Sequence, residues 1–373
     1  MKTFLAGLLI AIVALPSIST GAADLQSSLD TLKAVGPKGS GNAAAQAAWR
    51  EVAASDAKQL PEILAALDDA NPLAANWIGT AVEAIAERGK RSGTLPKAGL
   101  ERFVLDTNHA PPARRLAFEC LSLVDSTAEK RLIPNMLDDP SLEMRRDAVA
   151  LVLKNAESLA EAEKTAEAVA AYKKAFAAAR DEDQVKLLAE RLEKLGHKPD
   201  LARHYGFILD WKVIGPFDNT GEKGFAVAYP PEKKIDPAAE HQGKQGKVKW
   251  IDHQSTDDHG LVDLNKLLGK EKGVVAYATS VFNCNKQRAV QIRMTSFNAA
   301  KLWINGRQVA AHEVYHGGSQ LDQYVDAATL KAGENVLLLK VCQNEQTQPW
   351  AEGWGFKLRI CDETGTAILD TNR

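Results

Sequence analysis

The segment His312-Glu313-Val314-Tyr315-His316 has the spacing of a zinc-hydrolase motif and is the first candidate for chemistry in this sequence. In such a motif two histidines four residues apart on one helix bind the metal, and the intervening glutamate activates water. Here the segment follows a predicted β-hairpin and runs into Gly317-Gly318. On a strand the two histidines share one face, while Glu313 points to the other. A zinc-dependent hydrolase using residues 312–316 is therefore an alternative that the local pattern disfavours.

Other side chains could bind a structural Ca²⁺. Asp257 and Asp258 stand in a polar segment, and Asp322 offers another carboxylate. Ca²⁺ takes several oxygen ligands from loops, but the spacing here does not match an EF-hand. A solvated polar turn is the favoured interpretation, and no other cofactor is expected. The four cysteines form no CxxC pair, so they indicate neither a zinc site nor a redox site.

Aromatic rings are the candidates for carbohydrate binding, because sugar C–H faces pack on exposed rings and nearby polar groups fix the orientation. Trp350 and Trp354 flank Ala351-Glu352-Gly353 in a predicted loop, which favours ligand contact. Trp303 alternates with apolar neighbours on a predicted strand and so faces the other side of the sheet. The candidate ligand-binding residues are Trp303, Tyr315, Trp350, Glu352 and Trp354. For any single Trp, burial is the commoner outcome.

Residues 205–373 are predicted to form one antiparallel β-sandwich that positions these side chains. Asn305-Gly306 between two apolar runs is a strong hairpin signal, because both turn residues need positive φ. Trp303, Asn305 and Gly306, and further on Leu330, Gly333 and Asn335, resemble two motifs of the galactose-binding-like superfamily. That superfamily includes sugar-binding domains attached to glycoside hydrolases. The resemblance implies a jelly-roll fold and a glycan as a possible ligand.

Residues 24–157 are predicted to form stacked helical hairpins. The segment is rich in Ala, Leu, Glu and Lys, and its apolar residues recur at helical spacing. Asp139-Pro140, Met144-Arg145 and Ala148 occupy the places of the Asp-Pro turn, the Val-Arg pair and the small residue of a HEAT repeat, which this unit resembles. The resemblance implies an N-terminal α-solenoid, in which neighbouring hairpins bury each other's apolar stripes.

The same pattern recurs less completely around Arg114. We expect Arg114 and Arg145 to bond the acidic residues of the turns, because solenoid stability rests on interfaces between neighbouring repeats. Residues 158–200 are predicted to form a helical hairpin that caps the array. Asp181 is the expected N-cap of its second helix and Gly196 the expected C-cap. The fold class is therefore α + β, with a helical part followed by a β-sandwich.

The N-terminus is typical of a signal peptide. Lys2 precedes an apolar run from Phe4 to Leu15, and Gly21-Ala22-Ala23 fits cleavage before Asp24. Residues 1–23 are therefore predicted to be removed on export, to a periplasmic or secreted location. No later stretch is apolar enough to span a membrane.

Composition narrows the function further. The 46 basic and 48 acidic residues nearly cancel, so no nucleic-acid partner is expected. No GxSxG, phosphate-binding loop or dinucleotide fingerprint is present, and the chain is not expected to be an enzyme. The hypothesis is a non-enzymatic exported binding or scaffold protein, whose sandwich recognises a glycan or protein and whose repeats engage a protein partner. The alternatives are the zinc hydrolase and a purely structural envelope scaffold.

Overall fold

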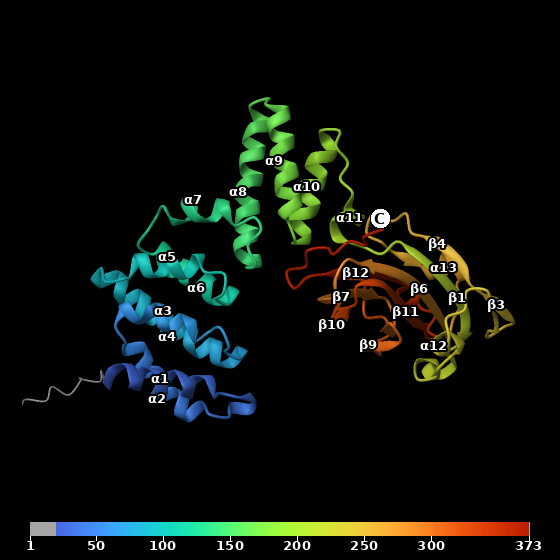
Figure 1. Cartoon of the computed structure of the whole chain (residues 1–373), viewed down its shortest axis with the longest axis horizontal. Coiled ribbons are helices and arrows are strands. Elements are labelled where there is room, and N and C mark those ends of the chain that lie inside the picture. Colours follow the sequence, from blue (N-terminus) through green and yellow to red (C-terminus); the bar gives the residue numbers. More distant parts are fainter. Residues whose placement is uncertain (1–19, 373) are drawn as a thin grey trace, which may run out of the picture. The chain divides into compact units, whose positions relative to one another are not determined.

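The computed structural model describes residues 20–372 (Figure 1). These residues fall into two compact units, and the boundary lies between Leu151 and Val152. The predicted signal peptide lies outside the described residues, apart from its last four positions, which begin the first helix. Helices fill the first part of the chain and antiparallel sheets the last part, which confirms the α + β class. Among the described residues, no helix is long and apolar enough to cross a membrane.

The first unit consists of helices, and each packs mainly on helices close to it in the sequence. Asn71 shows how one of them begins: its side chain accepts hydrogen bonds from the backbone of Leu73 and Ala74, and Pro72 occupies the first helical position. The helix ends at Gly93, which adopts the left-handed conformation. The helices are α1 (Thr20–Lys33), α2 (Asn42–Ala54), α3 (Leu60–Ala65), α4 (Pro72–Ser92), α5 (Lys97–Leu105), α6 (Pro111–Ser122), α7 (Ala128–Leu132) and α8 (Leu142–Glu161), which continues past the boundary.

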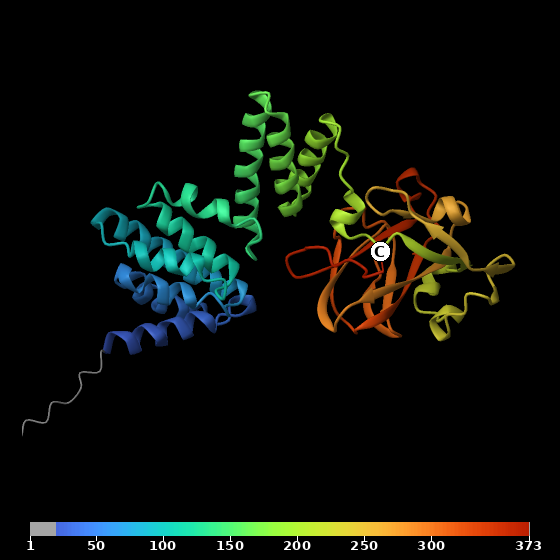
Figure 2. The ribbon, with the colours of Figure 1, turned by 45° about the horizontal axis from the view of Figure 1, so that its top comes forward.

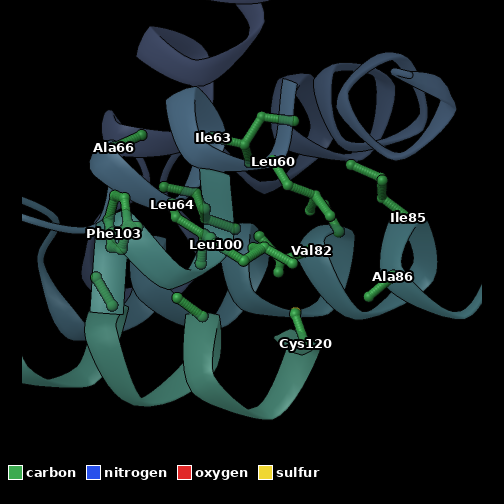
Figure 3. Close-up of a cluster of buried hydrophobic side chains, with 14 of the residues drawn as sticks. Leu60, Ile63, Leu64, Ala66, Val82, Ile85, Ala86, Leu100, Phe103 and Cys120 are labelled. Atoms are coloured by element: carbon green, nitrogen blue, oxygen red, sulfur yellow. The ribbon is translucent and has the colours of Figure 1, made fainter. Parts of the chain in front are cut away.

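One apolar core runs through this unit. Leu60, Leu64 and Leu100 meet between α3, α4 and α5, with small Ala86 beside them (Figure 3). Small residues at such positions let helix backbones approach closely, which a solenoid of hairpins requires. Cys120, on α6, is part of the same core and is buried.

A buried ion pair joins two turns of the first unit. The guanidinium of Arg114 donates to both carboxylate oxygens of Asp139, at 2.7 and 2.8 Å, and its Nε donates to the backbone oxygen of Val104. Arg145 Nε donates to the backbone oxygen of Asp139 at 2.9 Å. The prediction that Arg114 and Arg145 bond the acidic turns is confirmed. Bidentate geometry of this kind is the strong form of an Arg–carboxylate pair.

The second unit begins with helices and continues as two antiparallel sheets (Figure 2). A six-stranded sheet has the order β4-β1-β6-β11-β8-β9, and a four-stranded sheet has the order β10-β7-β12-β5. The helices are α9 (Thr165–Ala178), α10 (Glu182–Lys194), α11 (Leu201–Tyr205), α12 (Pro230–Lys233) and α13 (Leu264–Leu268). The strands are β1 (Asp210–Asp218), β2 (Glu240–Gln242), β3 (Lys247–Lys249), β4 (Ile251–Gln254), β5 (Val262–Asp263), β6 (Val274–Cys284), β7 (Arg288–Ser296), β8 (Ala300–Ile304), β9 (Arg307–His312), β10 (Tyr324–Leu330), β11 (Gly333–Gln343) and β12 (Gly355–Cys361).

The two sheets enclose the main core of this unit. Alternate residues of β6 and β11, such as Ala278 and Leu339, face Ile292 and Leu358 of the other sheet. This follows from the two-residue period of a strand. The predicted hairpin at Asn305-Gly306 joins β8 to β9, and both turn residues have positive φ, 52° and 79°.

The outer face of the six-stranded sheet carries a second, smaller core. Residues 219–250, here named the covering segment, include Phe225 and Trp250, which form this core together with Phe217, Tyr277 and Leu338 of the sheet. Although it is rich in Pro and Gly, this segment contains the short elements η4 (Thr220–Phe225), α12, β2 and β3.

A buried lysine anchors the covering segment. Lys340, on β11, is fully buried, and its ammonium lies 2.9 Å from Glu232 and donates to the backbone oxygens of Phe225 and Val227. Tyr277 donates to the same carboxylate of Glu232 at 2.5 Å. Burial lowers the pKa of Lys340, and the Glu232 carboxylate opposes that effect. The segment is thus held to the sheet by charge as well as by apolar contact.

Polar contacts also join the helices of the second unit to its sandwich. Arg359 of β12 donates to the backbone oxygen of Tyr205 at 3.1 Å, and Arg180 donates to Thr366 at 3.1 Å. Lys198 pairs with Asp258 at 2.9 Å. These bonds place α9, α10 and α11 against the sheets without a flexible linker.

Candidate functional site

One edge of the sandwich presents an exposed aromatic ring. Trp350 lies in the short helix η5 (Pro349–Ala351), which follows β11, and 64% of its surface is exposed. It is the most exposed of the large apolar side chains described for the chain. The ring of His316, from the loop after β9, stands perpendicular to the Trp350 ring with centroids 5.1 Å apart. An exposed aromatic ring next to a polar imidazole suits a ligand that has both an apolar face and polar groups.

His316 is positioned by two asparagines. Its backbone N–H donates to Asn298 Oδ1 at 3.1 Å, and its ring Nε2 lies 3.0 Å from Asn344 Oδ1. The backbone of His316 has φ of 56°, a left-handed conformation uncommon outside glycine. Strain of this size is found where surrounding contacts over-determine the backbone, often at functional sites.

Asn344 links the imidazole to a carboxylate. Its Nδ2 donates to Glu222 Oε1 at 3.0 Å, and because a carboxylate only accepts, the amide orientation is fixed. Asn344 Oδ1 must then face His316, so Nε2 of that ring carries the proton. The backbone N–H of Gln346 also donates to this oxygen, at 3.2 Å. Asn344 is nearly buried, whereas Glu222, Gln346 and Trp350 are exposed around it.

A layer of buried amides lies behind this edge. Asn219 Nδ2 donates to the hydroxyl of Tyr315 at 3.1 Å and to the backbone oxygen of Gln343 at 3.0 Å. Asn298 and Gln343 both donate to the backbone oxygen of Gly353, which follows η5. Burial raises the pKa of Tyr315, so its hydroxyl stays protonated. These bonds connect the loops behind the edge, although the amide oxygen of Asn219 has no hydrogen-bond partner.

The predicted ligand-binding residues separate in the structure. Trp350 and Tyr315 belong to this edge, which we name the Trp350 edge: Glu222, Tyr315, His316, Asn344, Gln346 and Trp350. Trp354 is 1% exposed, and its indole N–H points to the backbone of Val341 in the core, so its prediction as a ligand contact is wrong. Glu352 is exposed and pairs with Lys270 at 3.5 Å. Trp303 lies on the outer sheet face, partly buried against the second core.

The three predicted metal ligands do not form one site. Asp322 binds Arg293 and Arg359, and although burial alone would raise its pKa, these guanidinium groups lower it. Asp257 accepts hydrogen bonds from its own loop, and Asp258 pairs with a lysine. No group of three or more potential metal ligands occurs among residues 20–372. The proposed Ca²⁺ site at these residues is therefore not formed, because their oxygens already serve ion pairs and turns.

The HExxH segment does not form a zinc site either. His312 ends β9, stacks on Tyr324 with ring centroids 3.9 Å apart, and its Nε2 lies 2.8 Å from Asp326. His316 bonds Asn344 instead. The two imidazoles thus serve different partners, as expected when the segment is strand and loop rather than helix.

No pattern in the sequence predicted the cavity on the outer face of the six-stranded sheet. Its volume is about 710 Å³, and Ile235 and Pro237 of the covering segment line it together with Val281 and Val336. Both valines are exposed apolar side chains on the outer face of the sheet. The covering segment forms one wall of the cavity. The alternation of residues along a strand does not predict where that segment lies. Trp211 also lines it but is buried.

All four cysteines are buried and unpaired. Burial raises the pKa of Cys120 and Cys342 to about 12, and that of Cys361 to about 11. Thiols of this kind are poor nucleophiles, because the thiolate is the reactive form. They contribute packing to the cores rather than chemistry to the Trp350 edge.

Comparison with solved structures returns mainly glycoside hydrolases. A β-glucuronidase from an uncultured Clostridium is 13% identical, with a TM-score of 0.26 over 42% of this chain and 29% of that enzyme. A β-glucuronidase from glycoside hydrolase family 2 is 14% identical, with a TM-score of 0.26 over 42% of this chain and 17% of that one. A β-glucosidase from Kluyveromyces marxianus, in complex with glucose, is 12% identical, with a TM-score of 0.27 over 48% and 21%. The chain thus spans less than a third of each enzyme.

No protein-family model matches the sequence, and no curated protein matches it. The hypothesis of a non-enzymatic binding or scaffold protein is contradicted by the structural neighbours, which are glycoside hydrolases.

Proposed function

We propose that the β-sandwich of residues 205–373 is a carbohydrate-binding domain and that the Trp350 edge is its binding site. The observation that carries the proposal is the exposed Trp350 ring beside a hydrogen-bonded set of polar side chains. A pyranose ring has an apolar C–H face and a rim of hydroxyls, so an aromatic face with polar groups at its border matches both. Glu222, His316 and Gln346 supply that border.

The rigidity of the edge supports the same proposal. Its side chains come from three separate loops, yet Asn344 bonds two of them, and the buried amides fix the backbone behind them. A preorganised site loses less side-chain entropy on binding. The cavity of about 710 Å³ on the outer face offers no exposed aromatic ring. It is therefore a poorer match to a sugar than the Trp350 edge.

We also propose a specific architecture for each of the two parts of the chain. The Arg114–Asp139 pair between turns supports a HEAT-like α-solenoid for residues 24–157. The Asn305-Gly306 hairpin and the two-sheet order support a galactose-binding-like jelly roll. Export to a periplasmic or secreted location rests on the sequence of residues 1–23 alone. N-terminal sequencing of the protein from its own host would test it, since an intact Met1 would contradict cleavage.

The binding proposal is tested with the full chain on an array of glycans and polysaccharides. We expect specific binding that Trp350→Ala weakens by about tenfold, the effect of losing roughly 50–60 Å² of stacked apolar contact. Trp350→Phe, which keeps an aromatic face, should retain most of the affinity. The matched control is Val325→Ala, an exposed apolar side chain on β10. Equal binding by Trp350→Ala and the control would locate the site elsewhere, and no binding by the folded wild-type chain would refute the function.

A further inference from the structure

We propose that the Trp350 edge selects glycans that carry amino groups and excludes those that carry carboxylates. This inference rests on the proposed carbohydrate-binding function and adds the chemical class of the ligand. It follows from the charge and hydrogen-bonding capacity of two exposed carboxylates on this side of the sandwich, those of Glu222 and Glu345.

Glu222 supplies the first acceptor. It lies in η4 with φ of 61° and ψ of 9°, a conformation that a non-glycine residue rarely adopts. The bond from Asn344 to Oε1 uses one of roughly four acceptor positions of this carboxylate. The side chain is exposed, so the remaining positions are open to solvent or ligand.

Glu345 supplies a second acceptor beside Asn344. Its Oε1 accepts the backbone N–H of Gly221 at 2.5 Å, so this carboxylate lies against the turn that carries Glu222. Two carboxylates from different loops thus converge on the same edge. The ammonium of Lys272 donates to the backbone oxygen of Ala351 in η5 at 2.8 Å.

The imidazole of His316 is held in a fixed orientation beside Trp350. Glu222 accepts from the Asn344 amide nitrogen, so the amide oxygen faces His316 Nε2, which donates to it. A chain of two hydrogen bonds therefore connects the Glu222 carboxylate to the ring next to Trp350.

A ligand must complement this pattern with donors. An ammonium group donates three hydrogen bonds and attracts both carboxylates, and a hydroxyl donates one. A uronic acid brings a third carboxylate that can only accept and that is repelled by the other two. We expect the Trp350 edge to bind amino sugars most tightly, neutral sugars less tightly and uronic acids most weakly.

The test is calorimetric titration of the full chain with three hexasaccharides: chitosan hexamer, N-acetylated chitin hexamer and oligogalacturonate. At mildly acidic pH, where the chitosan amino groups are protonated and the carboxylates stay ionised, and at low salt, we expect the chitosan hexamer to bind about fivefold more tightly than the chitin hexamer, a modest ratio because the charges are exposed. We expect oligogalacturonate to bind most weakly. High salt should reduce the first ratio by screening the charges.

The key variant is Glu222→Gln, which keeps an oxygen acceptor for Asn344 while it removes the charge. It should lower the preference for chitosan by about half and improve galacturonate binding. The matched control is Glu334→Gln, which removes an exposed charge from the opposite end of β11 and should change neither ratio.

The possible results distinguish a failure of the charge selection from a failure of the proposed carbohydrate binding. Binding of the chitin hexamer with no preference among the three sugars, or an unchanged ratio in Glu222→Gln, would overturn the charge selection and leave carbohydrate binding intact. Tighter binding of oligogalacturonate than of chitosan would also overturn it. Failure of all three sugars, together with a blank glycan array, would refute the proposed function itself.

Discussion

We expect the removal of the Lys340 ammonium to destabilise the packing of the covering segment on the six-stranded sheet. In Lys340→Met a flexible apolar chain of similar length replaces the buried lysine. Glu232 then keeps a largely buried charge whose remaining partner is Tyr277, and the backbone oxygens of Phe225 and Val227 lose their donor. Breaking a buried pair in this way costs about 3–5 kcal/mol, because it leaves an uncompensated charge.

The size of the second unit converts this cost into a shift in melting temperature. The unit runs from Val152 to Arg373, which is 373 − 151 = 222 residues. For a unit of this size about 1 kcal/mol corresponds to roughly 2–4 °C, so we expect Lys340→Met to lower the melting temperature of the sandwich by roughly 10 °C. The double variant Lys340→Met with Glu232→Leu removes both charges and should recover much of the loss, since apolar replacements of buried pairs are often nearly neutral.

Urea unfolding followed by tryptophan fluorescence measures the effect, because Trp211, Trp250 and Trp303 all report on this unit. The control is Lys212→Met, which breaks an exposed pair with Asp252 and should cost less than about 1 kcal/mol. A Lys340→Met variant that matches the control in stability would show that the buried pair does not anchor the segment. A double variant no more stable than Lys340→Met would contradict the stranded-charge explanation.

Three further predictions concern other parts of the molecule. Arg114→Met should destabilise the first unit by about 3–5 kcal/mol by stranding buried Asp139, whereas neighbouring Arg115→Met, with surface pairs, should cost less than about 1 kcal/mol by urea unfolding. Trp354→Ala should cost about 3–5 kcal/mol and Trp350→Ala less than about 0.5 kcal/mol in the same assay; similar losses would contradict the assignment of one ring to the core and the other to the surface. Burial lowers the pKa of His204 to about 4 from 6.5, so the unfolded chain binds more protons between these values, and stability should fall as pH drops from 6.5 to 4. His204→Phe, which keeps a ring against Phe176, should flatten that part of the stability curve, and an unchanged slope would contradict the assignment.

The parts of the fold that the sequence predicted are those set by local patterns. The strands β6, β8, β9, β11 and β12 follow from alternation and from the Asn305-Gly306 turn, and helices of the first unit follow from their caps and apolar spacing. The bonds of Arg114 were predictable too, because a repeat fixes which turn stands next to which helix. Strand β10 is harder to predict from the sequence, because its polar and small residues give it little apolar alternation.

The site was predictable only in part, because sequence distance hides its contacts. Trp350 and Trp354 stand four residues apart among similar neighbours, and only the start of β12 decides that Trp354 enters the core. Glu222 reaches Asn344 across 122 residues, and no local pattern marks that pair. The predicted metal ligands failed for the same reason, since the arginines that occupy Asp322 lie 29 and 37 residues away.

The covering segment determines how the ligand site could be re-engineered. Glu222 belongs to that segment, whereas Asn344 and Trp350 belong to the sandwich. The segment is fastened mainly by Lys340, Glu232 and its aromatic residues. Residues 219–250 could therefore be replaced as a unit to change one wall of the ligand site, provided that the replacement keeps a glutamate at the place where Glu232 meets Lys340 of β11.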